Sequence, residues 1–560
     1  SLLADLSEDA LLYVIVSDES QSAAHSALQT NGVTMENVQY INAPSDSYWT
    51  RDYAPWTIFD AEGDMHLVDF NYNRPRPLDN EIPGVMADFL ALDIYDLEMN
   101  HTGGNVMTDG RGKAMSTELV ISENNSLTSN QIHQRFSDFL GVSDYQIYTD
   151  PTATYIDHID CWAKLLDVDK VIIRRVPSTH PQYAAIENSV VQWQAQTSSY
   201  GTPYRIFRVD TPNDEPYTNS FIMNGKIYVP QMATANDAAA LAVYQSAMPG
   251  FEVSGYAFAS YQSTDALHCR VNTIFDDQMI FVKHNPPTQL YAHEEFTISV
   301  EVEHANSLNL TGSFIKWSTS PSGPWNLRPL IAEDYDTWTS SLTIPAVANL
   351  YYYIQAQDNT GRSTKLPLCA ELDPFVVPIL PNPDLPDWTV TQYPNPPATV
   401  HATVSVMGNP AAIGDLVGAF VGEECRGTGF VFSNRNNMVS IPIQLAESGE
   451  NVTFKVYSHT DDLIYDADLE LSPGTGEILG ADVPLQISCG LVQPVVNISL
   501  QDGEIHLNWD HVQNASYYQL GMSESPNGVF TPLFQTVENH CSFPAVFDRC
   551  YYIVIAVKDN

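Results

Sequence analysis

The stretch DKVIIRRV, residues Asp169–Val176, decides the fold class expected for the first half of the chain. Its apolar, β-branched run predicts a buried strand. Helical spacing follows over His180–Gln194, and another strand is predicted over Tyr204–Asp210. A strand, a helix and a second strand in succession indicate an α/β domain, because such units lay helices against a sheet.

The same alternation runs outward from this unit in both directions. Hairpins interrupt it, since Ser220–Val229 turns at Asn224–Gly225, a dipeptide typical of tight hairpin turns. Residues 1–285 are therefore expected to form one α/β domain, with strands too mixed for a simple doubly wound sheet. The further strands predicted are Leu11–Asp18, Trp56–Phe59, Met65–Asn71 and Met279–His284, and the further helices are Ser22–Leu28, Pro83–Leu92, Gln131–Leu140 and Asn236–Ser246.

The second half of the chain has a different pattern of apolar and polar residues. It predicts short alternating strands, such as Phe296–Val302, and shows no helical spacing. Residues 286–378 are predicted to form an immunoglobulin-like β-sandwich. The proline-rich run Pro378–Pro396 is expected to be a stiff linker. Residues 379–490 are expected to form a β-rich module of unknown role, and residues 491–560 a β-sandwich like fibronectin type III.

The chain is strongly acidic, with 68 Asp and Glu against 24 Lys and Arg among 560 residues, a formal net charge of -44. This charge excludes a nucleic-acid-binding protein held by phosphate contacts, because the field would repel the phosphates. Cationic partners are favoured instead. No apolar stretch reaches the roughly 18 residues that a transmembrane helix needs. Seven cysteines are too few for a disulfide scaffold, although Cys541 and Cys550 are close enough in sequence to pair.

Five clusters within the first domain could carry chemistry. Taken alone, each also has a structural interpretation: aromatic runs usually belong to a core, adjacent glycines often make a turn, and a single cysteine is usually a small buried hydrophobe. No HExxH or CxxC spacing accompanies them, so no metal site is predicted. The clusters are SYWTRDYAPW (Ser47–Trp56), NYNRPRP (Asn71–Pro77), HTGGNVMTDG (His101–Gly110), YIDHIDCW (Tyr155–Trp162) and ALHCR (Ala266–Arg270).

Taken together, the clusters indicate chemistry on a guanidinium group. That group is a planar cation, so two carboxylates can hold it by paired charge-assisted hydrogen bonds, and Asp52 and Asp160 are the candidates. Cys269 is the candidate nucleophile, because a thiol near a histidine can be activated. His158 can protonate departing ammonia and then activate water. It lies two residues before Asp160, on the same face if this segment is a strand.

A substrate with a free α-carboxylate would need cations at its far end. Arg74 and Arg76 supply two guanidinium groups, whose geometry suits a carboxylate, on an extended run stiffened by proline. A substrate that lacks a carboxylate would leave this pair without a partner, so the pair favours a substrate with a free carboxylate.

The motifs resemble those of a known family. WTRDY, NRPRP, HTGGN, YIDHIDCW, NSFI and ALHCR occur in the order found in the guanidine-group-modifying hydrolases. Within that group the sequence looks like the bacterial peptidylarginine deiminases of the Porphyromonas type, which are related to agmatine deiminase. The resemblance covers about residues 1–285 and implies a pseudo-fivefold α/β propeller around a central acidic pocket. One departure is Ala54, where the family pattern RDYGPW has glycine.

The resemblance also implies a reaction and the residues that perform it. The thiolate would attack the guanidinium carbon, loss of ammonia would leave a covalent thiouronium, and water would release citrulline, with no metal or organic cofactor. Export from a bacterial cell, into the medium or onto its surface, is implied as well. The implied catalytic residues are Cys269, His158, Asp52, Asp160 and Asn219, and the implied substrate-binding residues are Arg74, Arg76, Trp49 and Tyr155.

The function expected first is thus deimination of peptide or protein substrates with arginine at the C-terminus, and alternatives stay open. Agmatine or free arginine is the alternative substrate within the family. The β modules suit surface display, so a non-catalytic adhesin with an inert deiminase-like head is the alternative from another class. A papain-like protease is disfavoured, because the sequence around a papain nucleophile is absent and His158 precedes Cys269.

Overall fold

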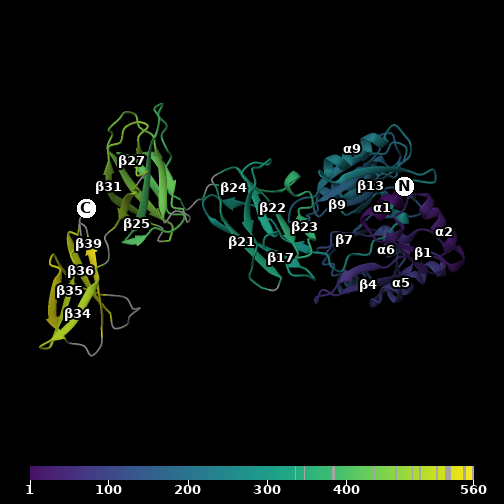
Figure 1. Cartoon of the computed structure of the whole chain (residues 1–560), viewed down its shortest axis with the longest axis horizontal. Coiled ribbons are helices and arrows are strands. Elements are labelled where there is room, and N and C mark those ends of the chain that lie inside the picture. The colour runs from purple at the N-terminus through teal and green to yellow at the C-terminus, as the bar shows by residue number, and fades with distance from the viewer. Residues whose placement is uncertain are drawn as a thin grey trace. The chain divides into compact units, whose positions relative to one another are not determined.

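The computed structural model describes residues 1–334, 336–345, 347–380, 382, 385–432, 437–460, 463–481, 483–490, 494–512, 515–523, 531–545 and 550–557. These residues fall into two compact units. The first contains Ser1–Leu290, Phe296–Leu342 and Val347–Ile379, and the second contains the other described residues. Figure 1 colours the chain from purple at the N-terminus to yellow at the C-terminus.

The first unit begins with five small sheets that repeat one plan. The first sheet has two parallel strands, β1 (Leu12–Val16) and β2 (Val38–Asn42), joined by helix α2 (Asp18–Thr30). Each of the other four has an antiparallel hairpin, a helix, and a third strand parallel to the second. These four modules are β3 (Trp56–Phe59), β4 (Met65–Tyr72), α5 (Ile82–Leu90) and β5 (Ile94–His101); β6 (Met107–Thr108), β7 (Lys113–Thr117), α7 (Ser129–Leu140) and β8 (Asp144–Tyr148); β9 (Ala163–Asp167), β10 (Lys170–Arg175), α8 (Tyr183–Gln194) and β11 (Arg205–Asp210); and β12 (Phe221–Met223), β13 (Lys226–Gln231), α9 (Asp237–Ala247) and β14 (Glu252–Ala257).

Local sequence explains where several of these elements begin and end. Thr128 and Gln131 form a capping box at the start of α7, which satisfies backbone donors that a first helical turn leaves free. Gly141 ends that helix at φ 63, a left-handed conformation that glycine adopts without strain. The predicted turn at Asn224 (φ 48) and Gly225 (φ 78) is confirmed between β12 and β13. The short helices are α1 (Leu2–Asp9), η1 (Met35–Asn37), α3 (Thr50–Tyr53), α4 (Pro77–Asn80), η2 (Gly103–Asn105), α6 (Leu119–Ser122), η3 (Ile159–Cys161) and η4 (His268–Arg270).

Parallel pairing brings loops that are distant in sequence to the same edge of a sheet. Strands β4 and β5 run in parallel, so their carboxyl ends lie together. The backbone N–H of Asn73, just after β4, donates to the carbonyl of His101, the last residue of β5, at 3.2 Å. The NRPRP and HTGGN runs therefore start side by side.

Two features of this domain differ from the sequence prediction. The segment YIDHIDCW is not a strand, because Asp157 has φ 56 and the residues after His158 form the single 3-10 turn η3. His158 and Asp160 thus do not share a strand face, and their side chains have different partners. Strands β2, β5, β6, β7, β8, β9 and β14 were also missed, because polar residues interrupt their apolar runs while neighbouring strands supply the hydrogen-bond ladder.

The first unit continues into two sheets of strands that each bury one face. The sheet orders are β15-β17-β21-β20 and β16-β24-β22-β18-β19, with β23 paired to β22. Within the described residues of this segment η5 (Ala370–Leu372) is the only helical turn. The strands are β15 (Phe281–Lys283), β16 (Leu290–Tyr291), β17 (Glu295–Glu303), β18 (Phe314–Ser318), β19 (Asn326–Pro329), β20 (Ile331–Ala332), β21 (Thr337–Thr343), β22 (Asn349–Gln357), β23 (Ser363–Leu366) and β24 (Phe375–Leu380).

A buried lysine joins these sheets to the α/β domain. Lys170 is fully buried, and its Nζ lies 2.6 Å from the carboxylate of Asp373 and 2.9 Å from the carbonyl of Ala247. The same Nζ lies 3.4 Å from the thiol of Cys369. Asp373 also accepts from Arg205 at 2.8 Å. The first β module and the α/β domain therefore share an ion pair whose lysine is buried, and its loss would leave the charge of Lys170 uncompensated.

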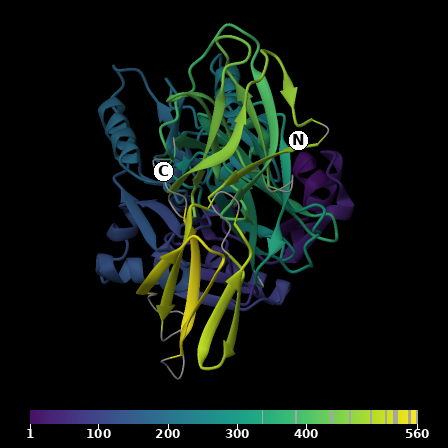
Figure 2. The ribbon, with the colours of Figure 1, turned by 90° about the vertical axis from the view of Figure 1, so that its left-hand side faces the viewer.

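Every regular secondary-structure element among the described residues of the second unit is a strand (Figure 2). Its larger module is a sheet of order β26-β25-β33-β31-β30-β27-β28, with β29 and β32 also paired to β25. Its last module has two three-stranded sheets, of order β34-β35-β38 and β37-β36-β39. The strands are β25 (Ala398–Val406), β26 (Asn409–Pro410), β27 (Leu416–Val421), β28 (Glu424–Phe430), β29 (Met438–Ile443), β30 (Val452–Ser458), β31 (Leu463–Leu471), β32 (Ile478–Leu479), β33 (Leu485–Cys489), β34 (Val496–Gln501), β35 (Glu504–Trp509), β36 (Tyr517–Ser523), β37 (Thr531–Thr536), β38 (His540–Pro544) and β39 (Tyr551–Val557).

All seven cysteines are free thiols, so Cys541 and Cys550 do not pair in this structure. None of the helices among the described residues is long and apolar enough to span a membrane.

Candidate active site

Each of the five modules contributes one short segment to the site, and each segment follows the last strand of its module. Three of these segments are 3-10 turns, and α3 is a single α-helical turn. The contributions are Asp52 on α3 after β2, Gly103–Asn105 after β5, His158–Asp160 after β8, Asn219 after β11 and Cys269 after β14.

Asn219 holds the segment that carries the predicted nucleophile. Its Nδ2 donates to the Sγ of Cys269 at 3.3 Å, and its Oδ1 accepts from the backbone N–H of Cys269 at 3.3 Å. Its carbonyl accepts from the backbone N–H of His268 at 3.1 Å. Cys269 is 1% exposed, and burial followed by the charges of Asp160 and Asp52 raises the pKa of its thiol well above the ordinary value. The amide of Asn219 partly offsets this effect, because it donates to the sulfur.

Asp160 lies beside both the thiol and a histidine. Its Oδ2 is 4.0 Å from the Sγ of Cys269 and 2.7 Å from the Nδ1 of His268. Burial, and then the nearby cations of Lys164 and Arg51, lower the pKa of His268 well below its usual range, so its imidazole is neutral. When the Asp160 carboxylate is ionised, Nδ1 of His268 carries the proton and donates to it. No role was predicted for His268 from the sequence, although its position directly before Cys269 was an available signal.

Asp52 and His158 face each other without completing a hydrogen bond. The Oδ1 of Asp52 lies 3.8 Å from the Nδ1 of His158. Among the described residues, that oxygen and both ring nitrogens of His158 are buried without a hydrogen-bond partner. Burial, and then repulsion by Asp160, raises the pKa of Asp52 to about 7. Burial lowers the pKa of His158 to about 3, so this imidazole is neutral as well.

The two glycines of HTGGN are required by the close approach of this pair. A Cβ at Gly104 would lie 2.6 Å from the Nδ1 of His158 and 2.7 Å from the Oδ1 of Asp52. At Gly103 it would lie 2.0 Å from the carbonyl oxygen of Arg51. Asn105 then accepts from the backbone N–H of Ile159 at 3.1 Å and so anchors the turn that bears Asp160. These glycines therefore shape the site and do not merely make a turn.

Two cations also act on the site, so it is not the purely acidic pocket that the resemblance implies. Burial, and then the charge of Arg51, lowers the pKa of Lys164, while Asp160 opposes this shift. Burial lowers the pKa of Arg51 to about 10, and Asp160 and Asp52 oppose it. Lys164, on β9, was not singled out from the sequence, because a lysine in a strand is ordinarily a surface residue.

The two arginines of NRPRP have different partners. Arg74 acts electrostatically on both Asp52 and His158, and its Nη2 is buried without a hydrogen-bond partner among the described residues. The guanidinium of Arg76 lies 4.3 Å from the centre of the Trp49 ring and donates to the hydroxyl of Tyr72 at 2.8 Å. Arg74 is thus close to Asp52 and His158, whereas the contacts of Arg76 are with Trp49 and Tyr72.

Two residues singled out from the sequence behave differently from expectation. Tyr155 is 81% exposed, so it does not belong to the buried cluster. Ala54 has φ -71 and ψ 150, an extended conformation that any residue adopts, and it is 2% exposed. Glycine is therefore not required at this position, and the extra methyl packs into the core.

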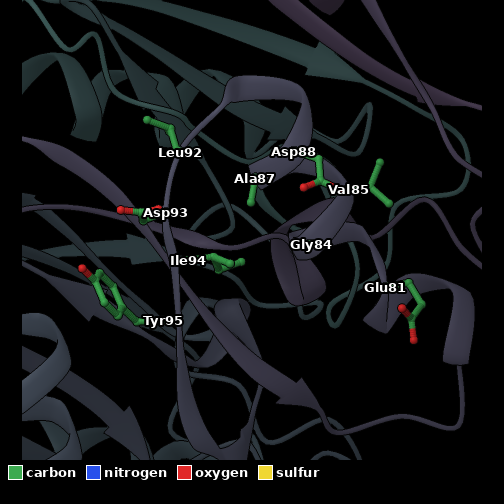
Figure 3. Close-up of a pocket in the computed structure, with 9 residues that line it drawn as sticks. All are labelled: Glu81, Gly84, Val85, Ala87, Asp88, Leu92, Asp93, Ile94 and Tyr95. Atoms are coloured by element: carbon green, nitrogen blue, oxygen red, sulfur yellow. The ribbon is translucent and has the colours of Figure 1, made fainter.

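A cavity of about 670 Å³ lies away from these residues (Figure 3). It is lined by α5, the start of β5 and the loop between them, and it contains none of the predicted site residues. Its lining is acidic, with Glu81, Asp88 and Asp93 beside Tyr95.

Comparisons with known proteins relate the α/β domain to deiminases. Residues 1–272 match the family model described as Porphyromonas-type peptidyl-arginine deiminase. A protein of Vibrio parahaemolyticus named "Putative agmatine deiminase" is 22% identical over 261 residues, which cover 39% of this chain and 72% of that protein. A protein of Yersinia pseudotuberculosis with the same name is 25% identical over 271 residues, 40% of this chain and 74% of that protein. The solved agmatine deiminase of Enterococcus faecalis has a TM-score of 0.43 and 18% identity, covering 48% of this chain and 84% of that chain.

The first half of the chain is therefore a deiminase domain of the class that modifies guanidino groups, hydrolases that act on C–N bonds of amidines. Within this class, residues 1–272 match the model of the Porphyromonas-type peptidyl-arginine deiminases, which confirms the resemblance that the motifs indicated.

Proposed function

We propose that the protein hydrolyses the guanidinium group of an arginine at the C-terminus of a peptide, releasing ammonia and leaving citrulline. The observation that carries this proposal is the convergence of Cys269, Asn219 and Asp160 from three modules. The Sγ of Cys269 lies 3.3 Å from the Nδ2 of Asn219 and 4.0 Å from the Oδ2 of Asp160. Asp52 comes from another module, and His158 comes from the segment that carries Asp160. The Oδ1 of Asp52 and the Nδ1 of His158 lie 3.8 Å apart. A thiol, a neutral imidazole and two carboxylates are the groups that the reaction needs.

The two carboxylates are proposed to hold the guanidinium. A guanidinium presents five N–H donors, and Asp52 has a buried oxygen without a partner in the described part of the chain. Paired, charge-assisted hydrogen bonds to Asp52 and Asp160 would satisfy both partners and align the carbon with the sulfur. The bound cation would also lower the pKa of the Cys269 thiol, because a positive charge nearby stabilises the thiolate.

The chemistry would then proceed in two stages through a covalent intermediate. Neutral His158 accepts the thiol proton, and the sulfur of Cys269 attacks the guanidinium carbon to form a tetrahedral adduct. His158 returns the proton to one nitrogen, which leaves as ammonia while a thiouronium remains on the sulfur. His158 next takes a proton from water, and the hydroxide attacks the same carbon. When the C–S bond breaks, the hydroxyl proton passes to the sulfur, which releases citrulline and the thiol, and His158 gives its proton to solvent or to ammonia.

The substrate's far end is proposed to meet the arginines of NRPRP. Arg74 and Arg76 offer two guanidinium groups to a carboxylate, and the unpartnered Nη2 of Arg74 supports this role. Agmatine is the second candidate substrate, which the names of the Vibrio and Yersinia relatives favour. A comparison of agmatine, free arginine and a peptide ending in arginine decides between them, and loss of the peptide preference in Arg74→Ala would support the clamp.

The domain is further proposed to be a closed ring of five modules around the site. Two observations support this ring. The five sheets follow one another along the chain, and a common centre is surrounded by their labelled strands, which are β1, β4, β7, β9 and β13 (Figure 1). Residues 286–378 and 491–560 are proposed to be immunoglobulin-like and fibronectin type III-like modules of a secreted or cell-surface protein.

The proposal is tested by measuring citrulline and ammonia released from a peptide with a C-terminal arginine. Cys269→Ala should abolish both products, whereas Cys541→Ser, which removes a half-buried thiol in the second unit, should leave the rate unchanged. Mass spectrometry of quenched reactions should show the adduct on Cys269. Full activity in Cys269→Ala would overturn the mechanism. If the wild-type protein releases no ammonia from any guanidine compound, the alternative of a non-catalytic adhesin with an inert deiminase-like domain would be favoured.

A further inference from the structure

A row of stacked cations and rings starts at the predicted carboxylate-binding arginine. The guanidinium of Arg76 lies 4.3 Å from the centre of the Trp49 ring, and the Trp49 ring lies 4.7 Å from that of Tyr48. Such contacts are favourable because a ring face attracts positive charge.

The row continues to the residue that follows the nucleophile. The guanidinium of Arg270 lies 4.9 Å from the Tyr48 ring, 5.1 Å from Phe258 and 5.2 Å from Tyr261. We call Arg76, Trp49, Tyr48, Arg270, Phe258 and Tyr261 the cation–aromatic row. It runs from the loop of NRPRP to the turn that bears Cys269, and it passes the segment that leads to Asp52.

The exposed part of the row is apolar and not cationic. Tyr48 is 55% exposed and Phe258 is 54% exposed. Arg270 contacts both rings and is already paired with Asp265, whose carboxylate lies 3.1 Å from Nε and 2.8 Å from Nη2. Its charge is therefore satisfied within the protein, and it would repel a second cation. What remains available at this surface is the faces and edges of two rings.

Arg270 also fixes the position of Phe258. Its Nη2 donates to the hydroxyl of Ser260 at 3.1 Å, and Ser260 and Asp265 belong to the same loop between β14 and η4 as Phe258. A ring held in this way loses less conformational entropy on binding than a free one.

We propose that Tyr48 and Phe258 bind the side chain that precedes the substrate's C-terminal arginine, and that this side chain is apolar or aromatic. The inference rests on the proposed function. A peptide with its guanidinium at Cys269 and its carboxylate at Arg74 and Arg76 has its preceding residue beside the segments that carry the row. A neutral side chain suits this place, since the exposed rings offer apolar area and Arg270, which contacts both, is already paired with Asp265.

The test compares kcat/KM for the peptides Phe-Arg and Gly-Arg, both with a free C-terminal carboxylate. In the wild-type protein Phe-Arg should be favoured about tenfold or more, as expected for filling an apolar subsite. In Tyr48→Ala and Phe258→Ala this ratio should fall toward one, while the rate on Gly-Arg changes less than about twofold. Tyr48→Phe keeps the ring and should keep the ratio, which separates the subsite from a folding defect.

Tyr95→Ala is the matched control, because Tyr95 is also exposed, at 43%, but lines the cavity of Figure 3. It should leave the ratio at the wild-type value. Equal rates on the two peptides, or a ratio unchanged in Tyr48→Ala and Phe258→Ala, would overturn the subsite while leaving the proposed function intact. Turnover of agmatine without turnover of any peptide would instead overturn the proposed function, and the subsite with it.

Discussion

At the scale of single residues, burial disfavours the charged form of each titratable group in the site. Asp52, Asp160, His158 and Cys269 are each at most 5% exposed. Burial raises the pKa of the two carboxyls and the thiol and lowers that of the imidazole. A cation that enters between the carboxylates reverses the largest of these effects, because it replaces the lost solvation. The free energy lost in the empty site is thus recovered on substrate binding.

Gly104→Ala should inactivate the enzyme without unfolding it. The added Cβ would meet the Nδ1 of His158 at 2.6 Å and the Oδ1 of Asp52 at 2.7 Å, so one of them must move. A displacement of about 1 Å in such a site costs on the order of 10²-fold in kcat. Gly84→Ala is the control, since nothing lies within 4 Å of a Cβ there and alanine suits the helix α5. Equal activity of the two variants in the citrulline assay would contradict the close approach.

Asp52→Asn should be inactive and yet more stable at alkaline pH. The pKa of Asp52 is about 7 in the folded protein against 3.8 ordinarily, so the folded state binds the proton more tightly than the unfolded chain. This group therefore lowers the free energy of unfolding progressively from about pH 4 to 7 and most strongly above pH 7. We expect Asp52→Asn to raise the free energy of unfolding by on the order of 1 kcal/mol or more at pH 8, with the gain vanishing near pH 4.

Asp79→Asn provides the opposite case, and denaturant titrations at pH 4 and pH 8 measure the free energy of unfolding of both variants. Asp79 is fully buried, but its carboxylate accepts from the backbone of Asp46 at 2.7 Å and from the hydroxyl of Ser47 at 2.7 Å. Loss of a carboxylate that is satisfied in this way should destabilise the protein at pH 8. A stabilising Asp79→Asn together with a destabilising Asp52→Asn would refute the assignment of the unsatisfied charge.

His268 is expected to be a positioning residue that keeps Asp160 ionised. The donor at 2.7 Å favours the carboxylate, so His268→Ala should raise the pKa of Asp160 and move the acid limb of kcat/KM to higher pH, by about one unit. His268→Asn places an amide N–H near the same position and should restore the profile. A purely structural role would lower the rate in both variants without moving the limb.

At the scale of elements, single helical turns position the reactive groups. The four turns α3, η2, η3 and η4 carry Asp52, Gly104, Asp160 and Cys269. A turn this short gives no hydrophobic periodicity, because it completes no repeat of apolar positions. This is why YIDHIDCW could be taken for a strand. Strands with apolar runs, such as Trp56–Phe59, were predicted correctly for the opposite reason.

Asn105→Ala should disturb the turn η3, although Asn105 itself belongs to the turn η2. The Oδ1 of Asn105 accepts from the N–H of Ile159 at 3.1 Å and from that of Thr117 at 3.0 Å, both buried. Two unsatisfied donors should lower the free energy of unfolding by about 1–3 kcal/mol or more, and kcat should fall because His158 and Asp160 flank Ile159. Asn125→Ala, whose amide donates only to the exposed carbonyl of Ser122, should leave both quantities near wild type. Thermal unfolding and the citrulline assay together check this.

At the scale of the whole molecule, the first β module is expected to stabilise the deiminase domain. A fragment ending at residue 285 would lose Asp373, the carboxylate 2.6 Å from the buried amine of Lys170. An unpaired buried charge costs about 3–5 kcal/mol, so this fragment should unfold at a clearly lower temperature than one ending at residue 380. Lys170→Met in the short fragment should recover part of the difference. Equal melting temperatures of the two fragments would show that the ion pair adds nothing.

From the sequence alone, the fold class, the change to short alternating strands after residue 285 and the residue types of the site could be predicted, because periodicity and motifs are local properties of the chain. Three contacts could be found only in the folded chain: His268 faces Asp160 across 108 positions, Asn219 holds Cys269 across 50, and Gly104 leaves room for Asp52 and His158. Those contacts depend on how the segments that follow the five modules come together, and no single stretch of sequence contains that geometry.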